Sequence, residues 1–166
     1  MSESTRSDPH QVVLSACRER QTRLREQMAG LECDLILLTR HESVQWLTGV
    51  HVSPLFAPAA TLDSDGRVTL VVPRRMLARI RAAADEVVDY EEKWHSTLRD
   101  DQRAASDDAL TAALPATSAR AGGEWSFLSP RLQAAFPEPI VDVEPTLFRL
   151  RRRKHDDELR MMRRAI

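Results

Sequence analysis

The chain has 166 residues, of which 42% are hydrophobic and 30% charged, and its 24 basic and 25 acidic side chains leave a net charge of −1. These values are typical of one globular domain and exclude fibrous and intrinsically disordered proteins. No run approaches the roughly 18 apolar residues that a membrane span needs, and residues 1–10 lack the apolar core of a signal peptide. We therefore expect a cytoplasmic protein without a membrane-spanning segment.

The two cysteines, Cys17 and Cys33, are too few for a disulfide framework and lack the spacing of a zinc site. Free cysteines are among the most often buried residues, so we expect both in the core.

The first element is predicted to be a helix that begins at Pro9, with Asp8 as its N-cap. Apolar side chains then recur at helical spacing as far as residue 31: Val13, Cys17, Leu24, Met28 and Leu31. This pattern predicts one buried helix face.

Residues 35–38 form a short apolar run, which is typical of a strand buried on both faces of a sheet covered by helices. Two further apolar runs, 59–62 and 68–72, flank the turn-forming residues 63–66. We predict an antiparallel hairpin there, and hence a mixed sheet.

A second helix is predicted over residues 74–84, followed by a strand at 86–90 and a helix over 98–114. Gly122 and Gly123 are interpreted as a break before a strand at 125–128. A short helix over 130–136 and a strand at 140–143 follow, which brings the prediction to six strands.

The end of the chain predicts a new helix that starts near His155, with three acids in its first turn and Glu158 at capping-box distance. Leu159, Met162 and Ile166 form an apolar stripe on it. A stripe on so short a helix needs a partner surface, so we expect the chain to be a fragment of a longer protein.

No catalytic or metal-binding motif emerges from the residues alone. His41 and Glu42 begin like a zinc-peptidase helix, but the position of the second histidine is Gln45. Asp63 and Asp65 fit the hairpin turn, and Asp107 with Asp108 is interpreted as a solvated helix face. The five glycines form no phosphate-binding loop, so no metal or nucleotide site is predicted.

Residues 149–166 carry 8 basic and 3 acidic groups, or +5, which leaves −6 for residues 1–148. A negative body argues against nucleic-acid binding outside the tail. The densest cation cluster is Arg149, Arg151, Arg152, Arg153 and Lys154. It either contacts acids of a neighbouring domain or binds phosphates.

Four sequence segments occur in order: R-x-x-R-L-R-x-x-M from Arg20, D-L-I-L-L-T from Asp34, S-V-Q-W-L-T-G from Ser43, and L-F-R-L-R-R-R-K-H-D-D-E-L-R-M-M-R-R-A from Leu147. Together they resemble the N-terminal domain of the creatinase, prolidase and Xaa-Pro aminopeptidase family. The third segment carries the family's aromatic-Leu-Thr-Gly step as Trp46, Leu47, Thr48 and Gly49.

The resemblance implies a three-layer α/β/α sandwich with a six-stranded mixed sheet of ribonuclease-H-like topology. It divides the chain into this domain at residues 1–148 and, at 149–166, a linker with the first helix of a missing catalytic domain. The family's peptidases bind two divalent metals, manganese, cobalt or zinc, through ligands of that second domain. None of those ligands lies in this chain, so we expect the chain alone to be inactive and the full-length protein to be a metallopeptidase that cleaves proline-containing peptides.

In the family, the N-terminal domain builds a homodimer, and the loop after the Thr-Gly step helps to shape the partner's substrate pocket. The corresponding loop is residues 50–58, and its candidate pocket residues are His51, Ser53, Leu55 and Phe56. Creatinase-like members carry a phenylalanine and an arginine there, but no arginine occurs between Arg40 and Arg67. This favours a Xaa-Pro peptidase over a metal-free amidinohydrolase, and Trp46, Thr48 and Gly49 are interpreted as structural.

A different class of function remains open, namely a stand-alone module that uses the basic residues 149–154 to bind an acidic protein or RNA. Binding that falls steeply with salt would favour it, because phosphate contacts release counterions. A small independent hydrolase is a third possibility, and it requires peptidase activity from this chain alone.

Overall fold

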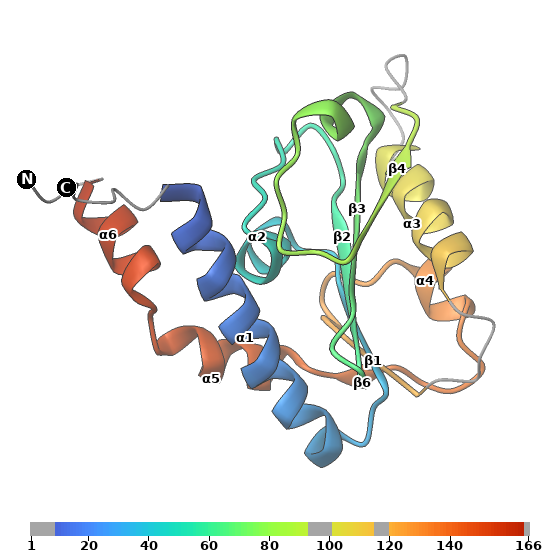
Figure 1. The fold of residues 1–166 in the computed structure, drawn as a ribbon. Helices are drawn as coiled ribbons and strands as arrows, with labels where there is room; N and C mark the ends of the chain where they lie inside the picture. The colour runs from blue at the N-terminus through green and yellow to red at the C-terminus, as the bar shows by residue number, and fades with distance from the viewer. Residues whose placement is uncertain (1–8, 93–100, 115–119, 165–166) are drawn as a thin grey trace, which may run out of the picture.

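The computed structural model describes residues 9–92, 101–114 and 120–164, and it shows an α/β domain with three layers (Figure 1). The six-stranded mixed sheet has the order β4-β3-β2-β1-β5-β6. Helices α1 (Pro9–Leu31), α2 (His41–Thr48) and α5 (Glu144–Arg152) lie on one side of the sheet, and α3 (Asp101–Ala113) and α4 (Pro130–Ala134) lie on the other. The predicted fold class is confirmed. No helix in the described ranges is both long and apolar enough to cross a membrane.

Strand β1 (Leu35–Leu38) is the centre of both cores because its side chains alternate between the two faces. Ile36 and Leu38 pack in the core beneath α1 and α2, whereas Leu35 and Leu37 pack in the core beneath α3 and α4. All four are buried, as the continuous apolar run predicts.

Strand β1 pairs antiparallel with β2 (Ala59–Asp63) and parallel with β5 (Ala121–Gly123). The predicted hairpin is confirmed, since β2 pairs antiparallel with β3 (Val68–Pro73). Its turn matches the prediction as well: Asp63 Oδ1 accepts from the backbone N–H of Arg67 at 2.8 Å, and Gly66 has φ +89°. Strands β4 (Glu86–Tyr90) and β6 (Val141–Asp142) complete the sheet.

The predicted strand at residues 125–128 is wrong, because the strand lies earlier, at Ala121–Gly123, and residues 125–127 form a turn. Packing explains the glycines of β5. A Cβ atom on Gly122 would lie 2.6 Å from Val143 Cγ1, and one on Gly123 would lie 2.6 Å from Leu128 Cδ1. The glycine pair therefore allows close approach within a strand instead of marking a break.

The predicted helix at residues 74–84 is also wrong: a short 3₁₀ helix, η1, covers Arg74–Arg79, and the chain then continues without helix to β4. Tertiary hydrogen bonds hold this segment. Ala83 N donates to the Thr48 carbonyl at 2.9 Å, and the Ala83 carbonyl accepts from Gln21 Nε2 at 2.6 Å. These bonds to α2 and α1 outweigh the helix propensity of the alanines.

Helices α1, α3, α4 and α6 (Asp156–Arg164) lie close to their predicted ranges, whereas α2 and α5 were not predicted from the sequence. Helix α1 buries Cys17, Leu24 and Met28 as its spacing predicts, and both cysteines are free and buried. Helix α6 has the predicted capping box, in which His155 N donates to Glu158 Oε2 at 3.0 Å. The Asp8 cap, Leu98 and Ile166 lie outside the described residues.

The interpretation of Asp107 as a solvated residue is wrong. Its side chain is buried, and its Oδ2 accepts a 2.5 Å hydrogen bond from Ser129 Oγ. Ser129 Oγ in turn accepts from Leu132 N as the N-cap of α4. The Asp107 carboxylate of α3 thus holds Ser129, the N-cap of α4, in place.

Candidate substrate-shaping loop

Residues 50–58 connect α2 to β2, and the geometry of α2 directs the start of this loop. Gly49 ends α2 in the left-handed conformation with φ +77°, and its N–H donates to the Gln45 carbonyl. Thr48 Oγ1 donates to the Val44 carbonyl at 2.8 Å and accepts from Val50 N at 3.3 Å. Thr48 and Gly49 are thus arranged to terminate the helix.

Trp46 lies on the buried side of α2 and is 5% exposed. Its backbone carbonyl accepts a 3.0 Å hydrogen bond from Arg20 Nη1 of α1. The Leu47 carbonyl accepts from Gln21 Nε2 of the same helix at 2.9 Å. The Trp-Leu-Thr-Gly step therefore fixes α2 against α1 and places the start of the loop.

The far end of the loop is anchored in the body of the domain. The Phe56 side chain is only 8% exposed and belongs to the core beneath α1 and α2. The Phe56 carbonyl accepts from His41 Nε2 at 2.7 Å, and Ala57 N donates to the Tyr90 hydroxyl oxygen at 3.0 Å. Burial raises the pKa of Tyr90 to about 12, so this hydroxyl stays neutral.

Between these anchors Val52 is still buried in the core, and the exposed side chains lie on either side of it. Leu55 is 75% exposed, more than any other large hydrophobic side chain that the structure describes. His51 is exposed, and Ser53 is half-buried with its Oγ accepting from Leu55 N at 3.4 Å. The structure therefore separates the four predicted pocket residues: Phe56 packs inward, whereas His51 and Leu55 are exposed and Ser53 is half-buried.

An arginine from a distant part of the sequence lies beside this loop. The guanidinium of Arg75, on η1, lies 5.7 Å from the centre of the Phe56 ring. The loop has no arginine of its own, but the fold brings one to its phenylalanine from a segment nearly twenty residues away. Although the sequence has no arginine between Arg40 and Arg67, the folded chain does have an arginine next to Phe56.

A second buried group was missed by sequence reasoning, namely Glu124 at the end of β5. It accepts hydrogen bonds from the backbone N–H groups of Thr39 and Arg40, both at 3.1 Å, and from Ser43 Oγ at 2.5 Å. Burial raises the pKa of Glu124, although these three hydrogen bonds act to lower it. The only signal in the sequence is one acid directly after the Gly122–Gly123 pair.

Glu124 binds the backbone N–H groups of Arg40, the N-cap of α2, and of Thr39 before it, because β1 and β5 are parallel and end side by side. Arg151 Nη1 of α5 reaches Ser43 Oγ at 3.3 Å and joins the same network. This arrangement holds β5, α2 and α5 together. Its partners are structural groups, and we assign it no catalytic role.

The side chains of the basic cluster at 149–154 have different hydrogen-bond partners. Arg149 Nη2 donates to Gln27 Oε1 at 3.1 Å, Arg151 joins Ser43, and Lys154 Nζ donates to the Arg151 carbonyl. Arg152 and Arg153 are exposed. Three of the five cations thus have hydrogen-bond partners within the chain.

Within residues 9–92, 101–114 and 120–164, no three His, Cys, Asp or Glu side chains converge as a metal site. His41 itself is bound to the Phe56 carbonyl. The described part of the chain therefore does not fit the two metals that the peptidases of the family bind.

Comparison with solved structures shows which proteins share this fold. The chain resembles the N-terminal domain of an X-Pro dipeptidase from Streptococcus pyogenes, with 19% identity, 79% of this chain and 98% of that chain covered, and a TM-score of 0.61. It also resembles the Xaa-Pro dipeptidase from Bacillus anthracis, with 17% identity, 87% of this chain and 38% of that chain covered, and a TM-score of 0.67. The prolidase from Pyrococcus horikoshii shares 18% identity, with 86% of this chain and 37% of that chain covered and a TM-score of 0.63.

These solved structures show the fold, and the chain spans less than two fifths of the longer ones. The comparison with curated proteins gave no match. Residues 20–152 match the model of the creatinase/prolidase N-terminal domain. The match covers most of the six-stranded domain and the Trp-Leu-Thr-Gly step described above, and on this basis the chain belongs to the creatinase/prolidase N-terminal domain family.

Proposed function

We propose that the chain is the non-catalytic N-terminal domain of a Xaa-Pro dipeptidase- or aminopeptidase-like hydrolase, in which it forms the homodimer and shapes the substrate pocket. Family membership and the similarity to domains of Xaa-Pro dipeptidases support this role. In the proposed full-length protein a following domain binds two divalent metals and cleaves the peptide. The division at residue 148 and the cytoplasmic location, which the two free cysteines favour, belong to the same proposal.

The observation that carries the specificity role is the exposure of Leu55 on an otherwise anchored loop. Exposed leucines are common, but this one projects from a segment whose far end is fixed by Phe56, His41 and Tyr90. A fixed loop that presents an apolar side chain is suited to form a wall of a peptide pocket in a partner subunit.

Substitution of Leu55 in the full-length protein tests this role. We expect Leu55→Ala to change the ratio of kcat/KM between Xaa-Pro dipeptides with large and small first residues by about tenfold, the scale on which apolar pockets discriminate. Leu77→Ala on η1 is the matched control, since Leu77 is an exposed leucine outside the loop. Equal ratios in both variants and the unmodified protein would exclude the specificity role.

The non-catalytic role has a separate test on the chain alone. We expect no hydrolysis of proline-containing dipeptides with added manganese or cobalt, because the described residues present no converging set of metal ligands. Hydrolysis that requires the metal would favour an independent hydrolase instead. Sedimentation of the full-length protein checks the homodimer, and a monomer at micromolar concentration would contradict that part.

Two alternatives keep a specific observation in their favour. Arg152 and Arg153 are exposed, as an interaction module that binds RNA or an acidic protein requires. Replacement of both by alanine would then abolish a salt-sensitive binding. Arg75 beside Phe56 supports a creatinase-like, metal-free amidinohydrolase, for which activity of the full-length protein would survive chelation of metals.

A further inference from the structure

Helix α6 contacts the rest of the domain through a polar side. Asp157 is only 5% exposed, whereas Leu159 is 37% and Met162 is 52% exposed. A surface helix ordinarily buries its apolar stripe and leaves its acids in water. Helix α6 does the reverse, and it lies beyond residues 20–152, the part that matches the family domain.

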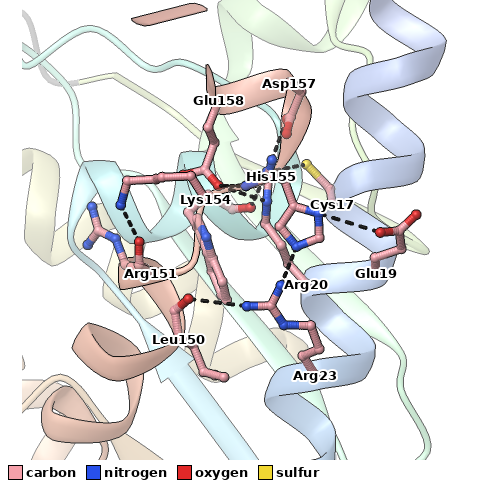
Figure 2. Close-up of polar contacts among 11 residues, drawn as sticks. Cys17, Glu19, Arg20, Arg23, Leu150, Arg151, Lys154, His155, Asp157 and Glu158 are labelled. Atoms are coloured by element: carbon pink, nitrogen blue, oxygen red, sulfur yellow. Dashed lines mark hydrogen bonds and ion pairs between the residues drawn. The ribbon is translucent and has the colours of Figure 1, made fainter. Parts of the chain in front are cut away.

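The group that receives Asp157 is Arg20, on the buried face of α1. Arg20 is 3% exposed, and its Nη2 donates to Asp157 Oδ2 (Figure 2). Its Nη1 donates to the Trp46 carbonyl at 3.0 Å and contacts Cys17 Sγ at 3.4 Å. Glu158 Oε2 lies 3.8 Å from Arg20 Nε and adds a second negative charge.

A second set of contacts holds the turn between α5 and α6. Arg23, one turn along α1, donates to the Leu150 carbonyl at 3.2 Å and contacts His155 Nε2 at 2.5 Å. The other ring nitrogen, His155 Nδ1, lies 3.5 Å from Glu19 Oε2. Figure 2 shows both arginines of α1 directed toward this turn and the first turn of α6.

The polar contact is incompletely satisfied. Four buried side-chain atoms in the described part of the chain have no hydrogen-bond partner, and two of them are Arg20 Nε and Asp157 Oδ1. A third, Nε1 of Trp46, belongs to the residue whose carbonyl Arg20 binds. Desolvation offsets much of the attraction in a buried ion pair, so such a pair adds little net stability, yet loss of one partner is costly.

From this balance we propose that Arg20 and Asp157 form a polar latch that fixes α6 on α1 and opens as a local unit while the sheet stays folded. Both charges regain hydration when the latch opens, and few apolar contacts of α6 are lost, since Leu159 and Met162 are already exposed. The closed latch sets the direction in which the chain leaves α5. The inference concerns α6 and α1 of residues 1–166, in which Leu159 and Met162 are uncovered, and the test uses this chain.

The test compares two neighbouring acids of α6 by hydrogen exchange of the full chain. Asp157→Asn removes the charge that Arg20 binds, whereas Asp156→Asn removes an equal charge from an exposed residue of the same turn. Both substitutions have the same effect on the helix dipole. We expect Asp157→Asn to accelerate amide exchange in α6 by about tenfold or more, with Asp156→Asn close to the unmodified chain and with β2 and β3 unchanged in all three.

Two outcomes would overturn the latch. Equal acceleration by both substitutions would show that α6 opens without regard to the ion pair. Acceleration throughout β2 and β3 by Asp157→Asn would show that the pair stabilises the whole fold.

A paired substitution provides an independent measurement. In the double variant Arg20→Met with Asp157→Leu, an apolar contact replaces the ion pair, and we expect greater protection of α6 than in either single variant, even though the Arg20 bond to the Trp46 carbonyl is also lost. The effects of the two single substitutions must then be far from additive. Additive losses would exclude a direct coupling between the two side chains.

Discussion

At the scale of single residues, the domain buries polar side chains that its pattern of apolar residues does not predict to be buried. Helix α1 buries Arg20 and Gln21 next to Cys17 and Leu24, and each polar side chain binds backbone carbonyls of α2. Backbone groups at the end of a short helix need such partners when they are buried. The two side chains therefore position α2 as well as filling space.

Trp46 is expected to be a major contributor to stability. Trp46→Ala removes a side chain that is 95% buried, and it should lower the free energy of unfolding by about 3–5 kcal/mol. Urea denaturation of the chain measures the loss. Trp46→Phe is the control: it keeps an aromatic ring and removes the unsatisfied Nε1–H, so it should cost clearly less. Equal losses would indicate that the indole N–H has a partner in solution.

Cys17 is expected to be unreactive in the folded chain. Burial raises the pKa of its thiol to about 11, and the reactive species is the thiolate. At pH 8 iodoacetamide should modify Cys17 only after unfolding, and peptide mass spectrometry reports the site. Rapid labelling of Cys17 in the native chain would contradict the burial.

At the scale of elements, close packing decides positions that local patterns leave open. Strand β5 consists of one alanine and two glycines, which have low strand propensity, and it nevertheless joins β1 to β6. Segment 80–85 has helix-forming alanines but follows hydrogen bonds to α1 and α2. In both cases the neighbours of an element select its conformation.

A pair of glycine substitutions tests the packing of β5. Gly122→Ala places a Cβ atom 2.6 Å from Val143 Cγ1 and 3.3 Å from Cys33 Sγ, so it should destabilise the domain by about 1–3 kcal/mol. Gly30→Ala is the matched control, because the new Cβ on α1 meets no atom within 4 Å. There alanine should raise stability by up to about 1 kcal/mol, and thermal denaturation of both variants shows whether the signs differ.

At the scale of the whole molecule, the titratable groups define a pH range of stability. The Arg18 hydrogen bond holds the pKa of Asp85 below its ordinary value of 3.8, so the unfolded chain takes up this proton first as the pH falls. Stability from Asp85 is present above about pH 3.8 and is lost below it. Glu124 has the opposite sign, because burial raises its pKa and its ionisation above 4.5 costs stability.

The alkaline limit follows from two buried groups with raised pKa values. Unfolded cysteine and tyrosine side chains ionise near 9 and 10, whereas Cys17 and Tyr90 keep their protons to about 11 and 12 in the folded chain. The stability they provide is complete below pH 9 and is lost as the pH rises toward 12.

Thermal denaturation from pH 3 to pH 11 should therefore show losses at both ends. Asp85→Asn should reduce the loss on the acid side, since the group that titrates is gone. Asp65→Asn is the control, because the Asp65 side chain is not part of the Arg18–Asp85 ion pair and Asp65 accepts from Arg25 through its backbone carbonyl. An unchanged acid limb in Asp85→Asn would exclude Asp85 as its source.

The sequence by itself determined the fold class, the hairpin, the buried run of β1 and the helical face of α1. These features depend on local periodicity and turn chemistry, which are written in consecutive residues. The ordered motifs also predicted the family, which the match over residues 20–152 confirms. The candidate loop was located in the same way, from its place directly after Trp46, Thr48 and Gly49.

Only the tertiary structure decided which loop residues project and which pack, as the inward Phe56 and the exposed Leu55 show. It also decided that Arg75 lies beside Phe56, that Glu124 caps α2, and that Arg20 meets Asp157 across 137 positions. Such pairs carry no local signal, because their energies arise from desolvation and packing between segments that meet only in the folded chain.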